Sequence, residues 1–234
     1  MTDISKTFRE KFSTALVADA AYRASVPLVA AAPGLNPIDR TMKITGPVIT
    51  VQANNDLASI IAALHRASPG DAIVVSNHTA DVALIGDLIA KEASRKGLAG
   101  IVVDGLIRDA VELIEIGLPV FCRGVYPVGP LKLPSNLKGK GELGIDLNFG
   151  EDSITAGDWV FGDADGILFI KSKNLPAVFE AAERSFRREK ALENKLRSGT
   201  ALGEMLAIES FLKKRESDPG ADFNQHLAEL QQAI

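Results

Sequence analysis

The feature that most constrains the fold is an alternation of short apolar segments with amphipathic segments in the middle of the chain. AIVV at 72–75, IVV at 101–103 and PVF at 119–121 have the length and composition of buried strands. The residues between them repeat apolar side chains at helical spacing, and Gly97 and Gly117 end the two helices. Strands that alternate with helices form βαβ units, so this region predicts a parallel sheet and an α/β fold.

Apolar periodicity sets the expected positions of the two helices. The second is predicted from Asp109 to Ile116. The first is predicted to carry one apolar face made of Leu84, Ile85, Leu88, Ile89 and Ala93.

The flanking regions have different patterns. GPVITVQ at 46–52 is β-branched and predicts a strand, and the segments 159–161 and 167–170 flank a Gly- and Asp-rich turn, which predicts a β-hairpin. A long helix is predicted over 176–198. The tail from about Lys213 is polar, and we expect it to be only loosely held.

Composition excludes several classes of protein. With 234 residues, the chain can bury a sizeable core without disulfides. Its formal net charge of −4, with no basic cluster free of acidic residues, argues against nucleic-acid binding. Cys122 is the only cysteine, which suits a reducing compartment. The polar N-terminus and the lack of a ~20-residue apolar run predict a cytoplasmic protein.

Two polar segments follow the first two predicted strands. Gly86-Asp87-Leu88-Ile89 comes after the strand at 72–75, and the segment from Asp104 to Asp109 comes after the strand at 101–103. Ligands of parallel sheets bind beyond the carboxyl ends of the strands. If the two strands are neighbours, both segments face one crevice.

These residue types suit the recognition of an oxo acid and a metal. Backbone N–H groups near Gly86 can hold a carboxylate, and Arg108 offers a planar fork of donors. Asp87 and Asp109 supply the hard oxygen ligands that Mg²⁺ or Mn²⁺ prefers. An Arg-Asp pair that opens a helix is, however, also typical of an N-terminal cap with a surface ion pair. The residues alone leave both interpretations open.

The spacing of the charged residues resembles a family signature. Asp87, twenty intervening residues and Arg108-Asp109 resemble the D-x20-R-D signature of the RraA-like family. The resemblance extends over roughly residues 13 to 200. Its blocks are STALVADA (13–20), GPVITVQ (46–52), PGDAIVV (69–75), the long segment from Gly86 to Gly124, and AGDWVFGDADGILFIK (156–171).

The resemblance implies an activity and residue roles. Enzymes of this family are class II aldolases of the 4-hydroxy-4-methyl-2-oxoglutarate / 4-carboxy-4-hydroxy-2-oxoadipate type, which release pyruvate, and the same enolate gives an oxaloacetate decarboxylase side activity. By position, Asp109 is expected on the divalent metal and Arg108 on the pyruvyl group. The N–H groups of Gly86, Leu88 and Ile89 are expected to bind its carboxylate.

Asp87 separates the expected enzyme from a regulator. It corresponds to the acid that distinguishes the aldolases from RraA, a relative that inhibits an endoribonuclease and lacks this acid. A non-enzymatic regulator that binds another protein is therefore the main alternative. A Schiff-base aldolase would need a lysine of lowered pKa, and Lys91, Lys96 and Lys171 do not suggest one. A methyltransferase is disfavoured because no glycine-rich nucleotide-binding turn follows a strand.

The resemblance also implies a fold and an assembly. The expected fold is a compact β/β/α swivelling-domain type, with a catalytic domain over 1–175 and a C-terminal helical extension over 176–234 that packs on a neighbouring subunit. Family members form homotrimers or homohexamers in which a neighbour lends an acid to the site. Glu189, in the apolar stripe of the long helix, is the candidate for that acid. The alternative is that the helix leaves the core after Phe186, which would expose it.

Three further residues have less specific interpretations. His78 follows the strand at 72–75 and is more often structural than functional in such a place. Cys122 has no histidine partner in the sequence pattern and predicts a buried, inert thiol. Ile85 stands where many family members have Trp, so the shape of the pocket, and with it the identity of the substrate, is in doubt.

Overall fold

A computed structural model describes most of the chain. The described residues are 4–78, 82–130, 133–134, 139–149 and 152–232. No helix among them is both long enough and apolar enough to cross a membrane.

The chain forms two compact units. The first comprises Met1–Ala182 and the second Glu183–Ile234, so the boundary falls inside the long helix α6 (Leu175–Arg197). The first unit contains the sheet and the two segments with Gly86–Ile89 and Arg108-Asp109. The second contains the end of α6 and the short helices α7 (Leu202–Met205), α8 (Ile208–Ser217) and α9 (Phe223–Gln232).

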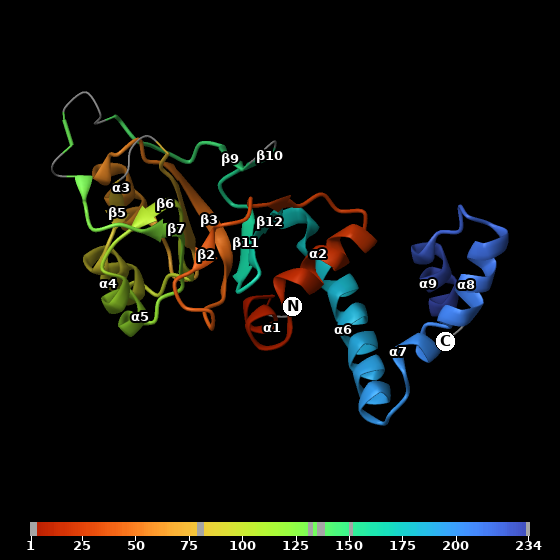
Figure 1. Cartoon of the computed structure of the whole chain (residues 1–234). Helices are drawn as coiled ribbons and strands as arrows, with labels where there is room; N and C mark the ends of the chain where they lie inside the picture. Colours follow the sequence, from red (N-terminus) through yellow and green to blue (C-terminus); the bar gives the residue numbers. More distant parts are fainter. Residues whose placement is uncertain (1–3, 79–81, 131–132, 135–138, 150–151, 233–234) are drawn as a thin grey trace. The chain divides into compact units, whose positions relative to one another are not determined.

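A mixed, curled sheet organises the first unit (Figure 1). Its hydrogen-bonded order is β1-β12-β11-β3-β4-β6-β7-β2, with β5 paired to β6 and β8 to β3. The bounds of these strands are β1 Val29–Ala30, β2 Asn36–Pro37, β3 Ile44–Gln52, β4 Ala72–Ser76, β5 Ala83–Ile85, β6 Gly100–Ile107, β7 Val120–Val125, β8 Glu142–Leu143, β11 Trp159–Asp163 and β12 Gly166–Ile170.

The predicted parallel sheet and hairpin are both confirmed. β3, β4, β6 and β7 run parallel, with Thr50 opposite Val74 and Val74 opposite Val102. β11 and β12 pair antiparallel as a hairpin. The α/β fold class is therefore as expected, with the C-terminal helices following the sheet domain.

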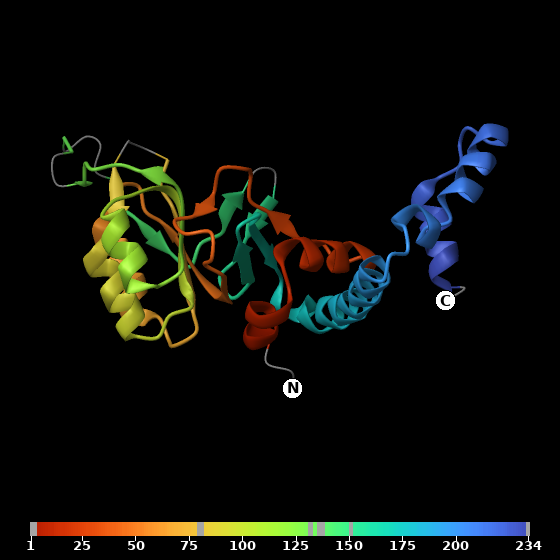
Figure 2. The same cartoon turned by 60° about the horizontal axis from the view of Figure 1, so that its bottom comes forward.

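Two cores lie on the two faces of the sheet. Figure 2 shows helices α3 (Leu57–Arg66), α4 (Asp87–Arg95) and α5 (Ala110–Ile116) together on one face. They bury a cluster with the odd-numbered residues of β3, β4 and β6, such as Val75 and Val103. The even-numbered residues of these three strands pack on the other face with the hairpin of β9 (Leu147–Phe149) and β10 (Asp152–Ile154).

The first predicted helix starts later than the periodicity indicated. Leu84 and Ile85 belong to β5 and not to the helix, which begins at Asp87. Tertiary pairing overrides the helical spacing here, because β5 continues alongside the end of β6 and Gly86 is fully extended between strand and helix. This shift places the start of α4 at the end of the sheet.

Both ends of the chain are helical. Helix α1 (Ile4–Lys11) precedes α2 (Thr14–Arg23), whose first turn is capped by the Ser13 side chain. At the other end, the tail that was expected to be loosely held forms α8 and α9. Phe211 and Phe223 pack there edge to face, with ring centroids 4.9 Å apart, and a polar composition concealed this small aromatic cluster.

One segment supplies both edges of the sheet. Strand β1 pairs with β12 at one edge and β2 with β7 at the other, and only residues 31–35 separate them along the chain. We call residues 31–35 the strap. Because the strap joins the two edges, it holds the sheet in its curled form.

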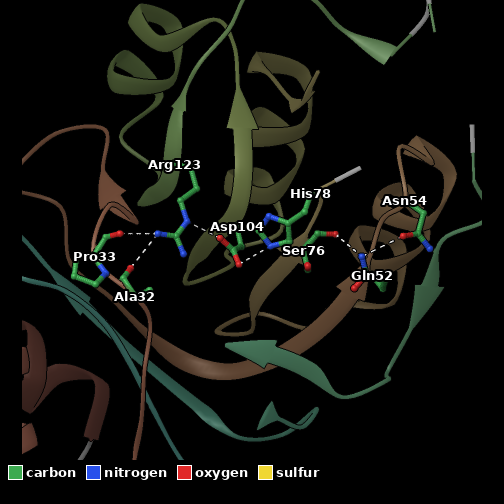
Figure 3. Close-up of polar contacts among 8 residues, drawn as sticks. All are labelled: Ala32, Pro33, Gln52, Asn54, Ser76, His78, Asp104 and Arg123. Carbon is green, nitrogen blue, oxygen red and sulfur yellow. Dashed lines mark hydrogen bonds and ion pairs between the residues drawn. The ribbon is translucent and has the colours of Figure 1, made fainter. Parts of the chain in front are cut away.

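Arg123 of β7 fastens the strap to the sheet (Figure 3). Its Nη1 donates to the carbonyl oxygens of Ala32 and Pro33, at 3.0 and 2.8 Å. Its Nε donates to Asp104 Oδ1 at 2.6 Å, and His78 Nε2 lies 2.9 Å from Asp104 Oδ2. The Asp104 side chain is only 5% exposed, so its charge depends on these partners.

We expect Arg123→Met to destabilise the first unit by about 2 kcal/mol or more, because it leaves Asp104 buried without its arginine partner. Methionine retains the packing of the aliphatic stem. Urea unfolding followed by the fluorescence of Trp159, the single tryptophan, reports on this unit. Arg95→Met, which removes an exposed ion pair with Glu92, is the control and should leave the stability nearly unchanged. Equal stability of the two variants would contradict the role of the strap.

Candidate functional site

The end of β6 and the start of α4 form the candidate site. β5 pairs with β6 in parallel, and the Arg108 N–H donates to the Ile85 carbonyl at 3.0 Å. Arg108 and Asp109 directly follow β6, and Gly86 and Asp87 directly follow β5. Because the two strands pair, the two segments begin side by side. The structure thus brings together the two polar segments that were predicted to face one crevice.

The first turn of α4 already binds carboxylates. Gly86 is its N-cap and offers no side chain to the free N–H groups of the first turn. The Asp87 N–H donates to Asp109 Oδ2 at 3.3 Å. The hydrogen bond from Lys91 lowers the pKa of the Asp87 carboxyl, and the backbone N–H of Leu88 adds to this effect. These contacts show which chemistry this helix end accepts.

Asp109 has an unusual backbone conformation. Its φ of 60° and ψ of 42° lie in the left-handed region, which costs a residue with a Cβ atom about 1–2 kcal/mol. As the N-cap of α5 it makes no side-chain hydrogen bond to that helix. Its carboxylate points instead toward α4 and lies 3.5 Å from Arg108 Nε. Strain of this kind is typical of functional positions.

Two glycines leave room for the charged side chains. A Cβ atom on Gly86 would overlap Asp109 Oδ2, and one on Gly129 would come within 2.6 Å of Arg108 Nη1. Any larger residue at either position would displace the group it faces. The backbone at both positions is thus shaped around Arg108 and Asp109.

The site is accessible and contains both cationic and anionic side chains. The side chains of Arg108 and Asp109 are 44% and 34% exposed, so a small ligand can reach both. Lys91 Nζ donates to Asp87 Oδ2 at 2.7 Å. The pKa of Lys91 is raised by this bond, and the charges of Glu112 and Asp109 add to the effect. A lysine so strongly protonated is unsuited to Schiff-base chemistry.

The residues present fit a divalent cation only in part. The carboxylate of Asp109 is accessible and makes no hydrogen bond that caps α5. Mg²⁺ is often held by one or two carboxylates together with water and substrate oxygens. Within the described part of the chain, no three His, Cys, Asp or Glu side chains converge. One chain therefore supplies part of a ligand set, and substrate, water or another subunit would have to complete it.

Four further candidates have other surroundings. Glu189 is exposed, as the interpretation that the helix leaves the core implied, and it belongs to the second compact unit. His78 contacts Asp104 in the network of Arg123. Cys122 is buried, as expected, and burial raises the pKa of its thiol to about 11. Ile85 is completely buried in the core beneath α4, so its side chain lines no open surface.

Sequence reasoning gave no function to two residues of the site. Lys91 is one of them, although its position four residues after Asp87 is the spacing of a helical ion pair. Gly129 lies in a Gly- and Pro-rich stretch, and its closeness to Arg108 follows only from the tertiary structure.

Comparison with known proteins gives a consistent result. The family described as RraA-like, Aldolase/RraA, matches residues 14–169. A protein of Halalkalibacterium halodurans named "Putative 4-hydroxy-4-methyl-2-oxoglutarate aldolase" is 31% identical over 182 residues, which cover 77% of this chain and 82% of the relative. A protein of the same name from Alkalilimnicola ehrlichii is 34% identical over 148 residues, covering 61% and 89%.

A solved structure agrees with these relatives. RraAS2 of Streptomyces coelicolor, described as an unusual member of the RNase ES inhibitor RraA protein family, superposes with a TM-score of 0.68. It is 25% identical, and the match covers 84% of this chain and 98% of the other. The chain belongs to the RraA-like family, and the predicted resemblance is confirmed.

The conformation of Asp109 gives a stability test that is independent of activity. Asp109→Gly should be more stable than Asp109→Ala by about 1 kcal/mol, because only glycine adopts a positive φ without steric cost. The same pair at Glu115, an exposed position within α5, should give the opposite order, with alanine more stable than glycine. Urea unfolding of the four variants measures both differences. An alanine preference at Asp109 would show that the left-handed conformation is not adopted in solution.

Proposed function

We propose that the chain is a divalent-metal-dependent aldolase that cleaves a 4-hydroxy-2-oxo acid to pyruvate and a second oxo acid, with oxaloacetate decarboxylation as a side activity. The observation that carries this proposal is the convergence of Arg108 and Asp109 on a helix end that already binds carboxylates. Membership of the RraA-like family and the aldolase names of two relatives support it.

The chain's own residues have distinct roles in the proposed reaction. The N–H groups at Gly86, Leu88 and Ile89 bind the carboxylate of the pyruvyl part, as the first turn of α4 binds side-chain carboxylates in the structure. Arg108 contacts the 2-oxo oxygen, where negative charge develops. Asp87, kept ionised by Lys91, accepts the proton of the C4 hydroxyl directly or through a water molecule.

Bond cleavage then follows from these contacts. As the C4 hydroxyl loses its proton, C4 becomes a carbonyl carbon and the electron pair of the C3–C4 bond passes to the pyruvyl part. The product there is an enolate, and the fixed charge of Arg108 stabilises it by several kcal/mol. Protonation at C3 gives pyruvate. Loss of carbon dioxide from oxaloacetate leaves the same enolate, which explains why one site can perform both reactions.

Asp109 is the residue that would hold the metal, Mg²⁺ or Mn²⁺. Its carboxylate is accessible and is a hard oxygen donor. A divalent cation bound there supplies additional positive charge to polarise the oxo acid.

The incomplete ligand set supports an assembly of subunits. We propose a homotrimer or homohexamer in which Glu189 of the neighbouring subunit completes the metal site. Glu189 is exposed, and among the residues that the structure describes it has no hydrogen bond or ion pair. Glu193, one turn later, is bound to Lys190 and Arg197 instead. Glu189 is thus the better available donor on this part of α6.

The alternative is a non-enzymatic regulator that binds a ribonuclease or another protein. The similarity to RraAS2 favours it. Asp87 argues against it, because an ionised acid beside Arg108 has a chemical use in an aldolase and none is required for protein binding. The absence of pyruvate release from every 2-oxo acid tested would favour the regulator.

Arg108→Ala should lower turnover about 10²-fold or more, because the enolate loses its fixed positive charge. Pyruvate release from 4-hydroxy-4-methyl-2-oxoglutarate and from oxaloacetate, coupled to lactate dehydrogenase, measures the effect. Removal of the metal with EDTA should abolish release, and Mg²⁺ or Mn²⁺ should restore it. Arg95→Ala, an exposed arginine of α4, is the control. Full activity in Arg108→Ala would refute the proposed site.

Subunit complementation tests the role of Glu189. Arg108→Ala and Glu189→Gln should each be nearly inactive as pure proteins. Mixed oligomers should regain roughly a quarter of wild-type activity, since some sites combine an intact Arg108 with an intact Glu189 of the neighbour. Oligomers built only from the double variant, which carries both Arg108→Ala and Glu189→Gln, should stay inactive. If Glu189→Gln is fully active, Glu189 is no part of the site.

A further inference from the structure

We propose that Asp104 is a positioning residue, which fixes a β-bulge in β6 and thereby sets the place of Arg108 and Asp109 without touching the substrate. The inference rests on the proposed function, which gives Arg108 and Asp109 their roles, and extends it to a buried residue four positions before Arg108. The family signature, with Asp87, Arg108 and Asp109, does not include Asp104.

Strand β6 carries one extra residue just before the candidate site. Val103 lies opposite Cys122 of β7, and the next matched pair is Leu106 and Gly124. β6 therefore advances three residues while β7 advances two. The extra residue lies at Asp104-Gly105 and forms a β-bulge. Bulges bend a strand and are over-represented next to active sites, where they re-aim a side chain.

Asp104 receives hydrogen bonds at the bulge from both neighbouring strands. Its carboxylate accepts from Arg123 Nε of β7 at 2.6 Å and lies 2.9 Å from His78 Nε2, just after β4. Figure 3 shows these two side chains reaching Asp104 from opposite sides. The Asp104 carbonyl oxygen also accepts from the Asn77 N–H at 3.0 Å. Because the Asp104 side chain is only 5% exposed, these bonds are stronger than they would be at the surface.

The bulge is also the place where β6 changes its partner. Pairing with β4 ends at Asp104, and pairing with β5 begins at Leu106. Between them, a Cβ atom on Gly105 would come within 2.8 Å of the Asn77 carbonyl oxygen, so the two backbones are in close contact. Two residues after Leu106, the Arg108 N–H donates to the β5 carbonyl that precedes Gly86. The bulge therefore decides where Arg108 leaves the sheet.

Amide exchange at residues 106–109 measures this positioning without any activity. Asp104→Ala removes the contacts with Arg123 and His78, so the end of β6 should open more often. We expect exchange at 106–109 to become about tenfold faster or more, while the amides of β11 and β12 keep their wild-type rates. Hydrogen–deuterium exchange of overlapping peptides, followed by mass spectrometry, resolves these segments. Asp104→Asn retains an acceptor for Arg123 and should give an intermediate rate.

The expected effect on activity is a loss in kcat at nearly constant KM. Asp104→Ala should lower kcat for pyruvate release about 10- to 100-fold, because a small misplacement of Arg108 weakens its contact with the developing enolate. KM should change less than about threefold, because the substrate carboxylate is bound by the N–H groups of α4. Asp104→Asn should recover most of kcat. Oxaloacetate should show the same losses, since it leaves the same enolate.

Asp163→Ala is the matched control. Asp163 is also a buried aspartate of the first unit. Its carboxylate accepts from the N–H and hydroxyl of Thr14, at 2.8 and 2.6 Å, and from the Asp165 N–H at 3.0 Å. These partners lie in α2 and in the turn between β11 and β12. Asp163→Ala should lower the free energy of unfolding, measured with urea, but leave kcat and exchange at 106–109 unchanged.

The outcomes separate this inference from the proposed function. Faster exchange at 106–109 with a lower kcat, in Asp104→Ala but not in Asp163→Ala, supports the positioning role. Wild-type exchange at 106–109 in Asp104→Ala overturns it, and so does an equal loss of kcat in both variants. If the wild type releases no pyruvate, the proposed function fails and the exchange rates alone decide this inference. Should Asp104→Ala not fold, Asp104→Asn provides the same comparison.

Discussion

The pairing of β5 with the end of β6 is the contact on which the candidate site depends. It brings two chain segments, each leaving a parallel strand, to the same level at the edge of the sheet. The first turn of α4 and the Arg108-Asp109 pair meet there because their strands are neighbours. Neither segment is a site by itself. Their combination gives free N–H groups, an arginine and two carboxylates within one small region.

Opposite charges allow the carboxylates and cations of the candidate site to lie close together. Carboxylates of Asp87 and Asp109 are stabilised by the N–H groups of α4, by Lys91 and by Arg108. The strained conformation of Asp109 is maintained by the helix that follows it and by the space left at Gly86. The proposed substrate and cation would replace these mutual contacts when they bind.

A second polar cluster shows the difference between a structural and a functional network. Asp104 and Arg123 are as strongly charged as Asp109 and Arg108, but they lie on the opposite face of the sheet, and Asp104 is nearly inaccessible. The Arg123 guanidinium donates hydrogen bonds to Asp104 and to the carbonyl groups of the strap. The side chain of Arg108 is 44% exposed and that of Arg123 is 28% exposed, and this difference cannot be read from the sequence pattern.

Periodicity and turn residues determined the α/β class, the parallel central strands and the hairpin at 159–170, because local patterns fix which face of each element is buried. The D-x20-R-D spacing indicated the candidate site residues. Tertiary structure decided the rest. Sheet pairing made Leu84 and Ile85 a strand, aromatic packing folded the polar tail, and the fold of the chain brought Gly129 to Arg108. Lys91 gained its neighbours only when α4 and α5 packed together, because charges from separate elements meet through the fold.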